Sequence, residues 1–221
     1  LIIGSNFINS GIINNCLCGT SSHNMSSEKQ FRNPTEYGAP KPETATFTAT
    51  GGASAVISNK KSNIKIESAT IGRIVDYNQK DALNMGAVMA CAAADTLKRH
   101  LDDLNRKEDY YDLILTGVLG LYGRDILKEF MMIEHKIYIS CNYNDCGVML
   151  YDLEEQKEVL AGGSGPVCSA LVLYGFILNE MKKKNIKKVL LIATGALFSP
   201  TMLYQKENIL SIAHAISLEA I

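Results

Sequence analysis

Residues 187–214 read KKVLLIATGALFSPTMLYQKENILSIAH, and this stretch decides the fold expected for the chain. The continuous apolar run at 189–193 is typical of a strand buried on both faces, and Gly195 allows the backbone to turn sharply soon after it. Residues 165–184 have the pattern of a helix that is apolar nearly all round, and a glycine-rich turn at 161–165 precedes it. Helix, buried strand and glycine turn predict the crossover unit of a layered α/β domain, in which ligands sit outside the carboxyl ends of the strands.

The rest of the chain continues this alternation of strands and helices. A helix is predicted at 85–104, where apolar residues recur at three- and four-residue steps. Runs typical of strands occur at 14–20, 53–58, 64–71, 113–115, 146–151, 159–160 and 209–218. The order of the elements repeats loosely along the chain, which favours a duplicated α/β unit.

The composition excludes several classes of protein. The 221 residues are 47% hydrophobic and 20% charged, which is typical of a packed domain rather than a disordered chain. A formal net charge of -1 gives no reason to expect a nucleic-acid partner, and no apolar run approaches the roughly 20 residues that span a bilayer. The six cysteines have no metal-binding spacing, so we interpret them as reduced, largely buried thiols, and we expect neither a metal nor a cofactor.

The start of the chain has the pattern of a helix end. Leu1, Ile2 and Ile3 are apolar, and the first residue is not methionine. We therefore expect the chain to be a fragment of a longer protein.

Polar candidates for a site follow the first predicted strand. His23 stands at the end of that strand, and Arg32, Thr35 and Tyr37 lie in a loop punctuated by proline and glycine. His23 could equally cap the loop, and Arg32 could form an exposed ion pair that stabilises little. The glycines at 162–165 do not follow a strand with the spacing of a phosphate-binding loop.

Several long segments resemble the stage V sporulation protein AD family. These segments are SSHNMSSEKQFRNPTEYG, TGGASAVIS, AAADTLKRHLDDLNRKEDYYDLILTG, NDCGVMLYD, AGGSGPVCSALV and ATGALFSPTMLYQKENILSIAH. The resemblance implies a thiolase-like, layered αβαβα fold with two related halves, related to the ketoacyl synthases. Residues 1–63 would be the remainder of the N-terminal half and residues 64–221 the C-terminal half. The absent front part would carry the family's cysteine at the thiolase nucleophile position.

The resemblance also implies that this protein lacks catalytic side chains. In condensing enzymes a strand like the one ending at Thr116 is followed by a catalytic histidine, where this chain has Gly117. A catalytic asparagine stands at a helix start like 162–165, where this chain has Gly163. Condensation needs those side chains to stabilise an enolate oxygen. We therefore expect a binding protein rather than an enzyme.

The ligand implied by the resemblance is dipicolinic acid, free or as its calcium chelate, taken up into the developing spore. Its two carboxylates need donors such as arginine, hydroxyl or backbone N–H groups. The predicted ligand-binding residues are His23, Arg32, Thr35, Tyr37, Gly117, Asp145, Gly163, Ser164 and Gly195. Asp145 could also be a turn residue.

The resemblance further implies other stage V sporulation membrane proteins as partners, and a homodimer is a further expectation. The expected location is the cytoplasmic face of the spore inner membrane, or its periphery, with no transmembrane segment in this chain. Two other readings stay open. One is an acyltransferase or condensing enzyme of the thiolase superfamily, and the other is a structural subunit of a membrane channel complex.

Overall fold

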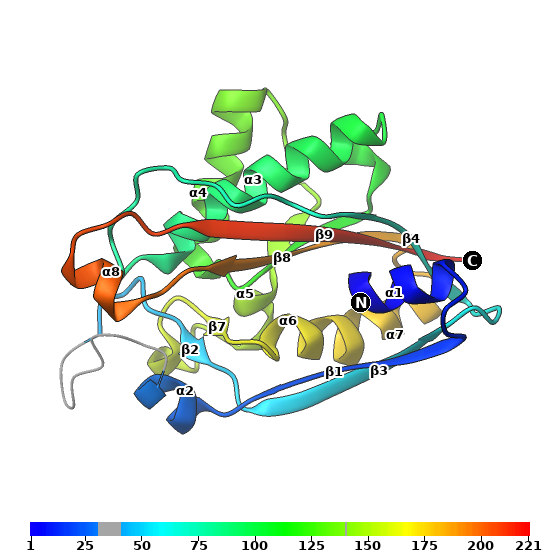
Figure 1. Ribbon diagram of the computed structural model, residues 1–221, viewed down its shortest axis with the longest axis horizontal. Coiled ribbons are helices and arrows are strands. Elements are labelled where there is room, and N and C mark those ends of the chain that lie inside the picture. The colour runs from blue at the N-terminus through cyan, green and yellow to red at the C-terminus, as the bar shows by residue number, and fades with distance from the viewer. Residues whose placement is uncertain (31–40, 140) are drawn as a thin grey trace.

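The computed structural model describes residues 1–30, 41–139 and 141–221, and its centre is a mixed five-stranded sheet (Figure 1). The strand order is β4–β9–β8–β5–β6. The strands are β4 (Ile64–Thr70), β9 (Ser211–Ala220), β8 (Lys188–Ala196), β5 (Leu113–Gly117) and β6 (Tyr143–Asp145). β5 runs parallel to both β8 and β6, while β9 runs antiparallel to β8 and β4. The layered α/β fold expected from residues 187–214 is confirmed.

One face of this sheet is covered by two helices, α3 (Met85–Asp103) and α4 (Gly120–His135), which lie above it in Figure 1. Alternate residues of a strand point to opposite faces, so Leu190 and Ile192 pack under α3, whereas Leu191 points to the other side. The buried face of α3 is rich in alanine, which allows the helix to lie close to the sheet.

The other face is covered by a continuous helical run made of α6 (Cys168–Leu171), the π-helical segment η3 (Val172–Ile177) and α7 (Leu178–Lys182). Below it in Figure 1 lies the antiparallel pair β1 (Asn15–Ser22) and β3 (Gly51–Ser58), with α1 (Ile2–Asn9) alongside. The helix predicted at 165–184 is therefore confirmed, but it begins at Cys168 and contains a π segment that the sequence pattern did not indicate.

The region around β6 differs from the prediction. The run 146–151, predicted as a strand, is the helix α5 (Cys146–Leu150), because the Asp145 carboxylate caps it by accepting a hydrogen bond from the Gly147 amide. The predicted partner strand at 159–160 is wrong as well, since Lys157–Val159 form a 3-10 turn, η2. The remaining short elements are α2 (Asn24–Gln30), β2 (Phe47–Thr48), η1 (Glu108–Tyr110), β7 (Gly163–Ser164) and α8 (Pro200–Tyr204).

The division of the chain into an N-terminal half, residues 1–63, and a C-terminal half, residues 64–221, stays a prediction. The boundary falls between β3 and β4, which belong to different sheets. The short parallel pair of β2 and β7 nevertheless joins Phe47 to Gly163 across it.

A buried polar network ties α3 to β4 and to the segment that precedes β5. His100 is fully buried, and its Nδ1 and Nε2 lie 2.7 Å from the Thr70 hydroxyl and 2.6 Å from the Tyr111 hydroxyl. Arg106 donates to the same tyrosine oxygen and pairs with Glu67. Burial lowers the pKa of His100 to about 4, so this histidine is neutral in the folded protein at pH 7.

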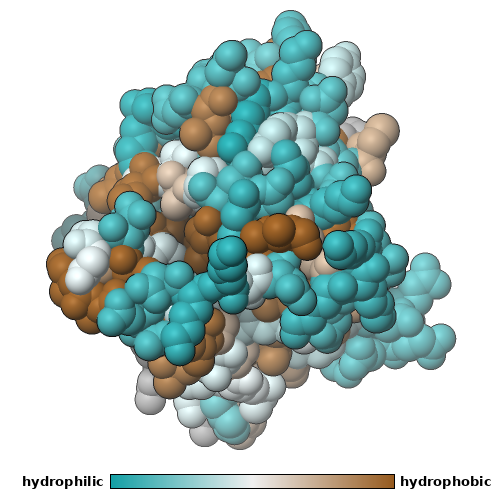
Figure 2. All heavy atoms as spheres, turned by 90° about the vertical axis from the view of Figure 1, so that its right-hand side faces the viewer, coloured by the Kyte–Doolittle hydropathy of each residue, from teal (hydrophilic) through white to brown (hydrophobic). Residues whose placement is uncertain are grey.

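The surface over α1, β1 and β3 exposes large apolar side chains, including Phe7, Leu17 and Val56. Figure 2 shows apolar groups interrupting a largely hydrophilic surface on the side of the molecule that faces right in Figure 1. In the described residues, no helix has both the length and the apolar character needed to cross a membrane. All six cysteines are free. Cys91, Cys146 and Cys168 are buried as expected, whereas Cys16 and Cys18 are half-buried and Cys141 is exposed.

Candidate functional site

The candidate site is an open stretch of the five-stranded sheet at the carboxyl ends of the parallel strands β5 and β8. Gly117, Ala193 and His214 are neighbours on β5, β8 and β9. The residues from Val189 to Ile192 are buried, yet Ala193 is exposed although it lies in a central strand. We call Gly117, Ala193, Gly195 and His214 the sheet floor.

The small residues of the sheet floor have two different effects. A Cβ atom on Gly117 would lie 3.3 Å from the Cβ of Ser169 and 3.6 Å from the Cα of Ala193, so this glycine lets the start of α6 approach the sheet. A Cβ atom on Gly195 would meet no heavy atom within 4 Å. The space for a ligand is therefore above Gly195 and Ala193 rather than beside Gly117.

Asp145 fixes the turn that follows Gly117. Its carboxylate accepts hydrogen bonds from the Leu119 amide at 2.9 Å, the Gly120 amide at 3.0 Å and the Thr116 hydroxyl at 2.8 Å, besides the Gly147 amide at 2.9 Å. The turn needs this support because Val118, a β-branched residue, has a φ angle of 66°, in the left-handed region, whereas Gly120 adopts its φ of 69° without strain.

The Asp145 carboxylate is buried and fully used in hydrogen bonds within the protein, so it does not contact a ligand. Burial raises the pKa of this fully buried carboxyl to about 6, while the hydrogen bonds from Leu119, Thr116 and Gly120 act in the opposite direction. Since both carboxylate oxygens are already bonded, Asp145 acts on the site by positioning the turn.

Gly163 and Ser164 lie away from the open part of the site. A Cβ atom on Gly163 would lie 2.9 Å from Tyr151 Cε2 and 3.1 Å from Cys168 Sγ, so the expected room beside this glycine is already filled. Both residues are buried in β7, and the helix starts only at Cys168. Burial raises the pKa of the Cys168 thiol to about 12, which keeps it protonated.

The predicted loop residues are not joined to the sheet floor by the described contacts. His23 is exposed at the end of β1, and its carbonyl oxygen accepts the Ser27 amide in the first turn of α2. Arg32, Thr35 and Tyr37 lie outside the described residues. All four therefore stay predictions.

One side chain of the sheet floor, His214, and one beside it, Ser169, were missed from the sequence. Ser169 lies next to Gly117, and His214 lies next to Ala193 on β9. Ser169 was hidden in an apolar helix pattern. The alternation of residues in β9 could have placed His214 on one face of the sheet, but the sequence does not give the register that sets it beside Ala193.

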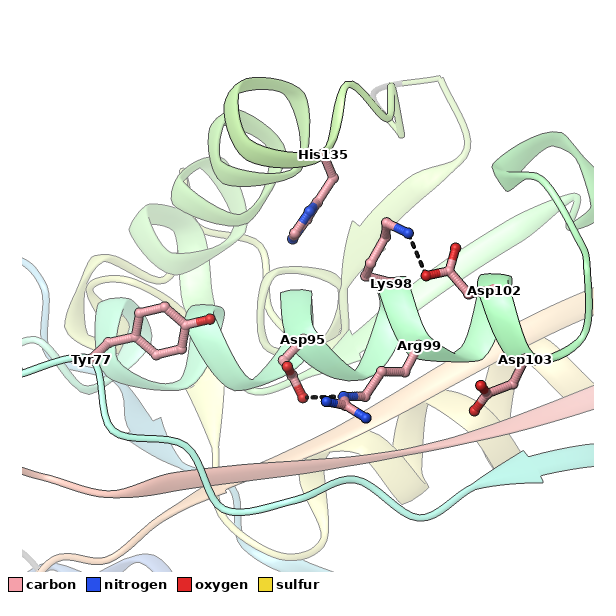
Figure 3. Close-up of a pocket in the computed structure, with 7 residues that line it drawn as sticks. All are labelled: Tyr77, Asp95, Lys98, Arg99, Asp102, Asp103 and His135. Atoms are coloured by element: carbon pink, nitrogen blue, oxygen red, sulfur yellow. Dashed lines mark hydrogen bonds and ion pairs between the residues drawn. The ribbon is translucent and has the colours of Figure 1, made fainter.

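Two hollows lie away from the sheet floor. One, of about 350 Å³, lies between α3 and α4 on the opposite side of the sheet and is lined by Tyr77, Asp95, Lys98, Arg99, Asp102, Asp103 and His135 (Figure 3). Its charges largely satisfy one another, since Asp95 pairs with Arg99 and Arg73, and Lys98 pairs with Asp102. The other lies on the strands β1 and β3 and is lined by Gly19, Thr20, Ser21, Gly52, Ala53 and Ser54.

No group of three or more histidine, cysteine, aspartate or glutamate side chains in the described part of the chain is arranged to hold a metal ion.

Comparison with known protein families gives one match over nearly the whole chain. The family described as Stage V sporulation protein AD matches residues 1–219. The stage V sporulation protein AD of Bacillus subtilis (strain 168) is 46% identical over 217 residues, which cover 98% of this chain and 63% of that protein. The chain thus spans less than two thirds of the length of this curated relative.

Solved structures resemble the chain in fold. The 3-oxoacyl-[acyl-carrier-protein] synthase III from Aquifex aeolicus VF5 gives a TM-score of 0.57 at 12% identity, covering 99% of this chain and 61% of the enzyme. The corresponding synthase from Pseudomonas aeruginosa PAO1 gives 0.55 at 8% identity, with coverages of 99% and 64%. These neighbours confirm the thiolase-like fold, and at such identities they show the fold alone.

Proposed function

This chain belongs to the stage V sporulation protein AD family, and on that premise we propose that it binds dipicolinic acid, free or as its calcium chelate, without transforming it. The binding would serve the uptake of dipicolinate into the developing spore. The observation that carries the proposal is the open sheet floor, where an exposed alanine and an unobstructed glycine lie near the carboxyl end of β8, next to the end of the parallel strand β5.

The sheet floor suits a flat ligand with carboxylates. Ala193 presents only a methyl group, and Gly195 presents only backbone, so a planar ring can lie on them. The helical run from Cys168 to Lys182 begins beside Gly117, and no side chain caps its first turn. The Cys168 amide donates to the Gly165 carbonyl oxygen, so only N–H groups that follow it could favour a carboxylate at this helix N-terminus.

The side chains present in the chain favour binding over catalysis. Gly117 supplies no acid, base or donor side chain where a condensing enzyme would have a histidine. Burial raises the pKa of the Cys146 and Cys168 thiols, so neither of these two cysteines is an activated nucleophile. The nucleophile position that the family resemblance implies lies outside this chain, so the absence of a catalytic side chain at Gly117 is what favours binding.

The location and partners belong to the same proposal. We place the protein at the cytoplasmic face of the spore inner membrane, or peripheral to it, where other stage V sporulation membrane proteins would receive the ligand. A homodimer is compatible with this role. Co-purification from sporulating cells would test both the partners and the location.

An acyltransferase is the second candidate, because the solved structures similar in fold include 3-oxoacyl synthases. Turnover of acyl-CoA by the full-length protein would support that candidate and contradict a purely binding role. A subunit that serves only to dock on membrane proteins would neither turn over acyl-CoA nor bind dipicolinate.

The proposal is tested by isothermal titration of dipicolinate into the full-length protein, with and without calcium. Isophthalate is the matched control ligand, since it carries two carboxylates at the same ring spacing without the ring nitrogen. The difference between the two affinities measures what the ring nitrogen contributes. We expect saturable binding of dipicolinate and no acyl-CoA turnover. If dipicolinate releases no binding heat at several temperatures and does not raise the melting temperature, the proposed function is wrong.

A further inference from the structure

Three residues lie in a row across the sheet floor. The middle one, Ala193, is flat and apolar, and a polar side chain lies on each side of it: His214 on β9, and Ser169 next to Gly117 on β5. Gly117, Ala193 and His214 are partners in register on adjacent strands. Strands are spaced about 4.8 Å apart, so the outer two backbones are roughly 10 Å apart. Leu191 and Ile216 face the helical run α6–η3–α7, and strand alternation puts Ala193 and His214 on that same face.

His214 is held with a defined tautomer. The Gly72 amide donates a hydrogen bond of 3.1 Å to its Nδ1, so Nδ1 carries no proton and the neutral ring has its N–H at Nε2. Only glycine fits at position 72, because a Cβ atom there would lie 1.8 Å from the carbonyl oxygen of Ala213. The close backbone approach that orients His214 therefore depends on this glycine.

Ser169 supplies a donor on the opposite side of Ala193. Its hydroxyl oxygen would lie 3.5 Å from a Cβ atom on Gly117, which places it at the β5 edge of the sheet floor. Within the described residues the Ser169 hydroxyl and His214 Nε2 have no hydrogen-bond partner, while every buried side-chain polar atom has one. Both donors are available to a ligand.

We propose that Ser169 and His214 each hold one carboxylate of a planar aromatic diacid whose ring lies over Ala193. This inference rests on the proposed function and adds to it the two side chains that select a diacid over a monoacid. Neither residue was among those predicted from the sequence. Ser169 lies in α6, which packs against Gly117, and His214 lies in β9, which pairs with β8.

The test uses the full-length protein with Ser169→Ala, His214→Asn and His214→Gln. Asparagine keeps an acceptor for the Gly72 amide but is too short to reach the ligand, whereas glutamine extends its amide toward the position of Nε2. His135→Asn is the matched control, because His135 lies in the hollow on the opposite side of the sheet. Melting temperatures confirm that each variant folds.

We expect Ser169→Ala and His214→Asn each to weaken dipicolinate binding by about tenfold or more, which corresponds to the loss of one charge-assisted hydrogen bond. His214→Gln should recover part of the affinity, and His135→Asn should bind like the wild type. Each single variant should also lose the preference for dipicolinate over picolinate, which has one carboxylate.

The outcomes separate the two proposals. If the wild type does not bind dipicolinate, both the proposed function and this inference are wrong. If the wild type binds and the folded Ser169→Ala and His214→Asn variants bind equally well, only the assignment of these two residues is wrong.

Discussion

Replacing Asp145 by alanine should destabilise the protein strongly, because this one carboxylate holds several backbone amides in the interior. The change removes the acceptor for the amides of Leu119, Gly120 and Gly147, all within a fully buried site. A buried donor without a partner costs about 1–3 kcal/mol, so three of them cost at least about 3 kcal/mol, and entry of water into the space limits the total to about 5 kcal/mol.

The measurement is the free energy of unfolding in urea, with Asp152→Ala as the matched control. The Asp152 carboxylate also accepts two backbone amides, those of Glu154 and Glu155, but this residue is exposed. Water can replace an exposed acceptor, so the control should lose less than about 1 kcal/mol. Equal losses in the two variants would refute the argument that Asp145 holds the turn after Gly117.

Three further predictions concern protonation, backbone contacts and thiols. The pKa of His100 is about 4 in the folded protein and about 6.5 in the unfolded chain, so lowering the pH protonates the unfolded chain first. The free energy of unfolding of the wild type, minus that of His100→Gln, should therefore be constant above pH 6.5 and smaller by about 2 kcal/mol at pH 5. The same difference at both pH values, measured by urea unfolding, would contradict this. Gly72→Ala should lower the melting temperature by many degrees, because the added Cβ atom would clash with the carbonyl oxygen of Ala213, whereas Gly195→Ala should leave it unchanged. Similar shifts in both variants would contradict the contacts assigned to these two glycines. Iodoacetamide at pH 7.5 should modify the exposed Cys141 much faster than the buried Cys168, as peptide mass spectrometry would reveal, and equal rates would count against the inert state of Cys168.

The fold could be predicted where one local pattern is enough. The apolar run at 189–193 and the helical period at 85–104 became β8 and α3, and β8 is buried on both faces from Val189 to Ile192 but not at Ala193. No local pattern is enough for the run at 146–151. Its helix is determined by the Asp145 carboxylate, which caps it and at the same time binds a turn 25 residues earlier in the chain.

The candidate site could be predicted only in part, because its geometry depends on contacts between distant segments. The glycine-rich segment at 161–165 does contain two left-handed glycines, Gly162 and Gly165, but the turn predicted at Gly195 is wrong, because Gly195 lies within β8 and faces open space. The sequence cannot show that Tyr151 fills the space beside Gly163, or that the register of β8 and β9 brings His214 next to Ala193. A glycine indicates that backbone comes close to something, and the fold decides whether that is a ligand or a side chain.

The measurement that tests the central claim most directly is the dissociation constant of dipicolinate for the full-length Gly195→Phe variant. A Cβ atom at Gly195 meets no heavy atom within 4 Å, so the new ring should occupy the ligand's place without disturbing the fold. Gly52→Phe is the matched control, since Gly52 is equally unobstructed but lies in the hollow on β1 and β3. We predict that Gly195→Phe keeps its melting temperature and binds at least about tenfold more weakly, while Gly52→Phe binds like the wild type. Unchanged affinity in a folded Gly195→Phe variant would contradict the placement of the ligand on the sheet floor.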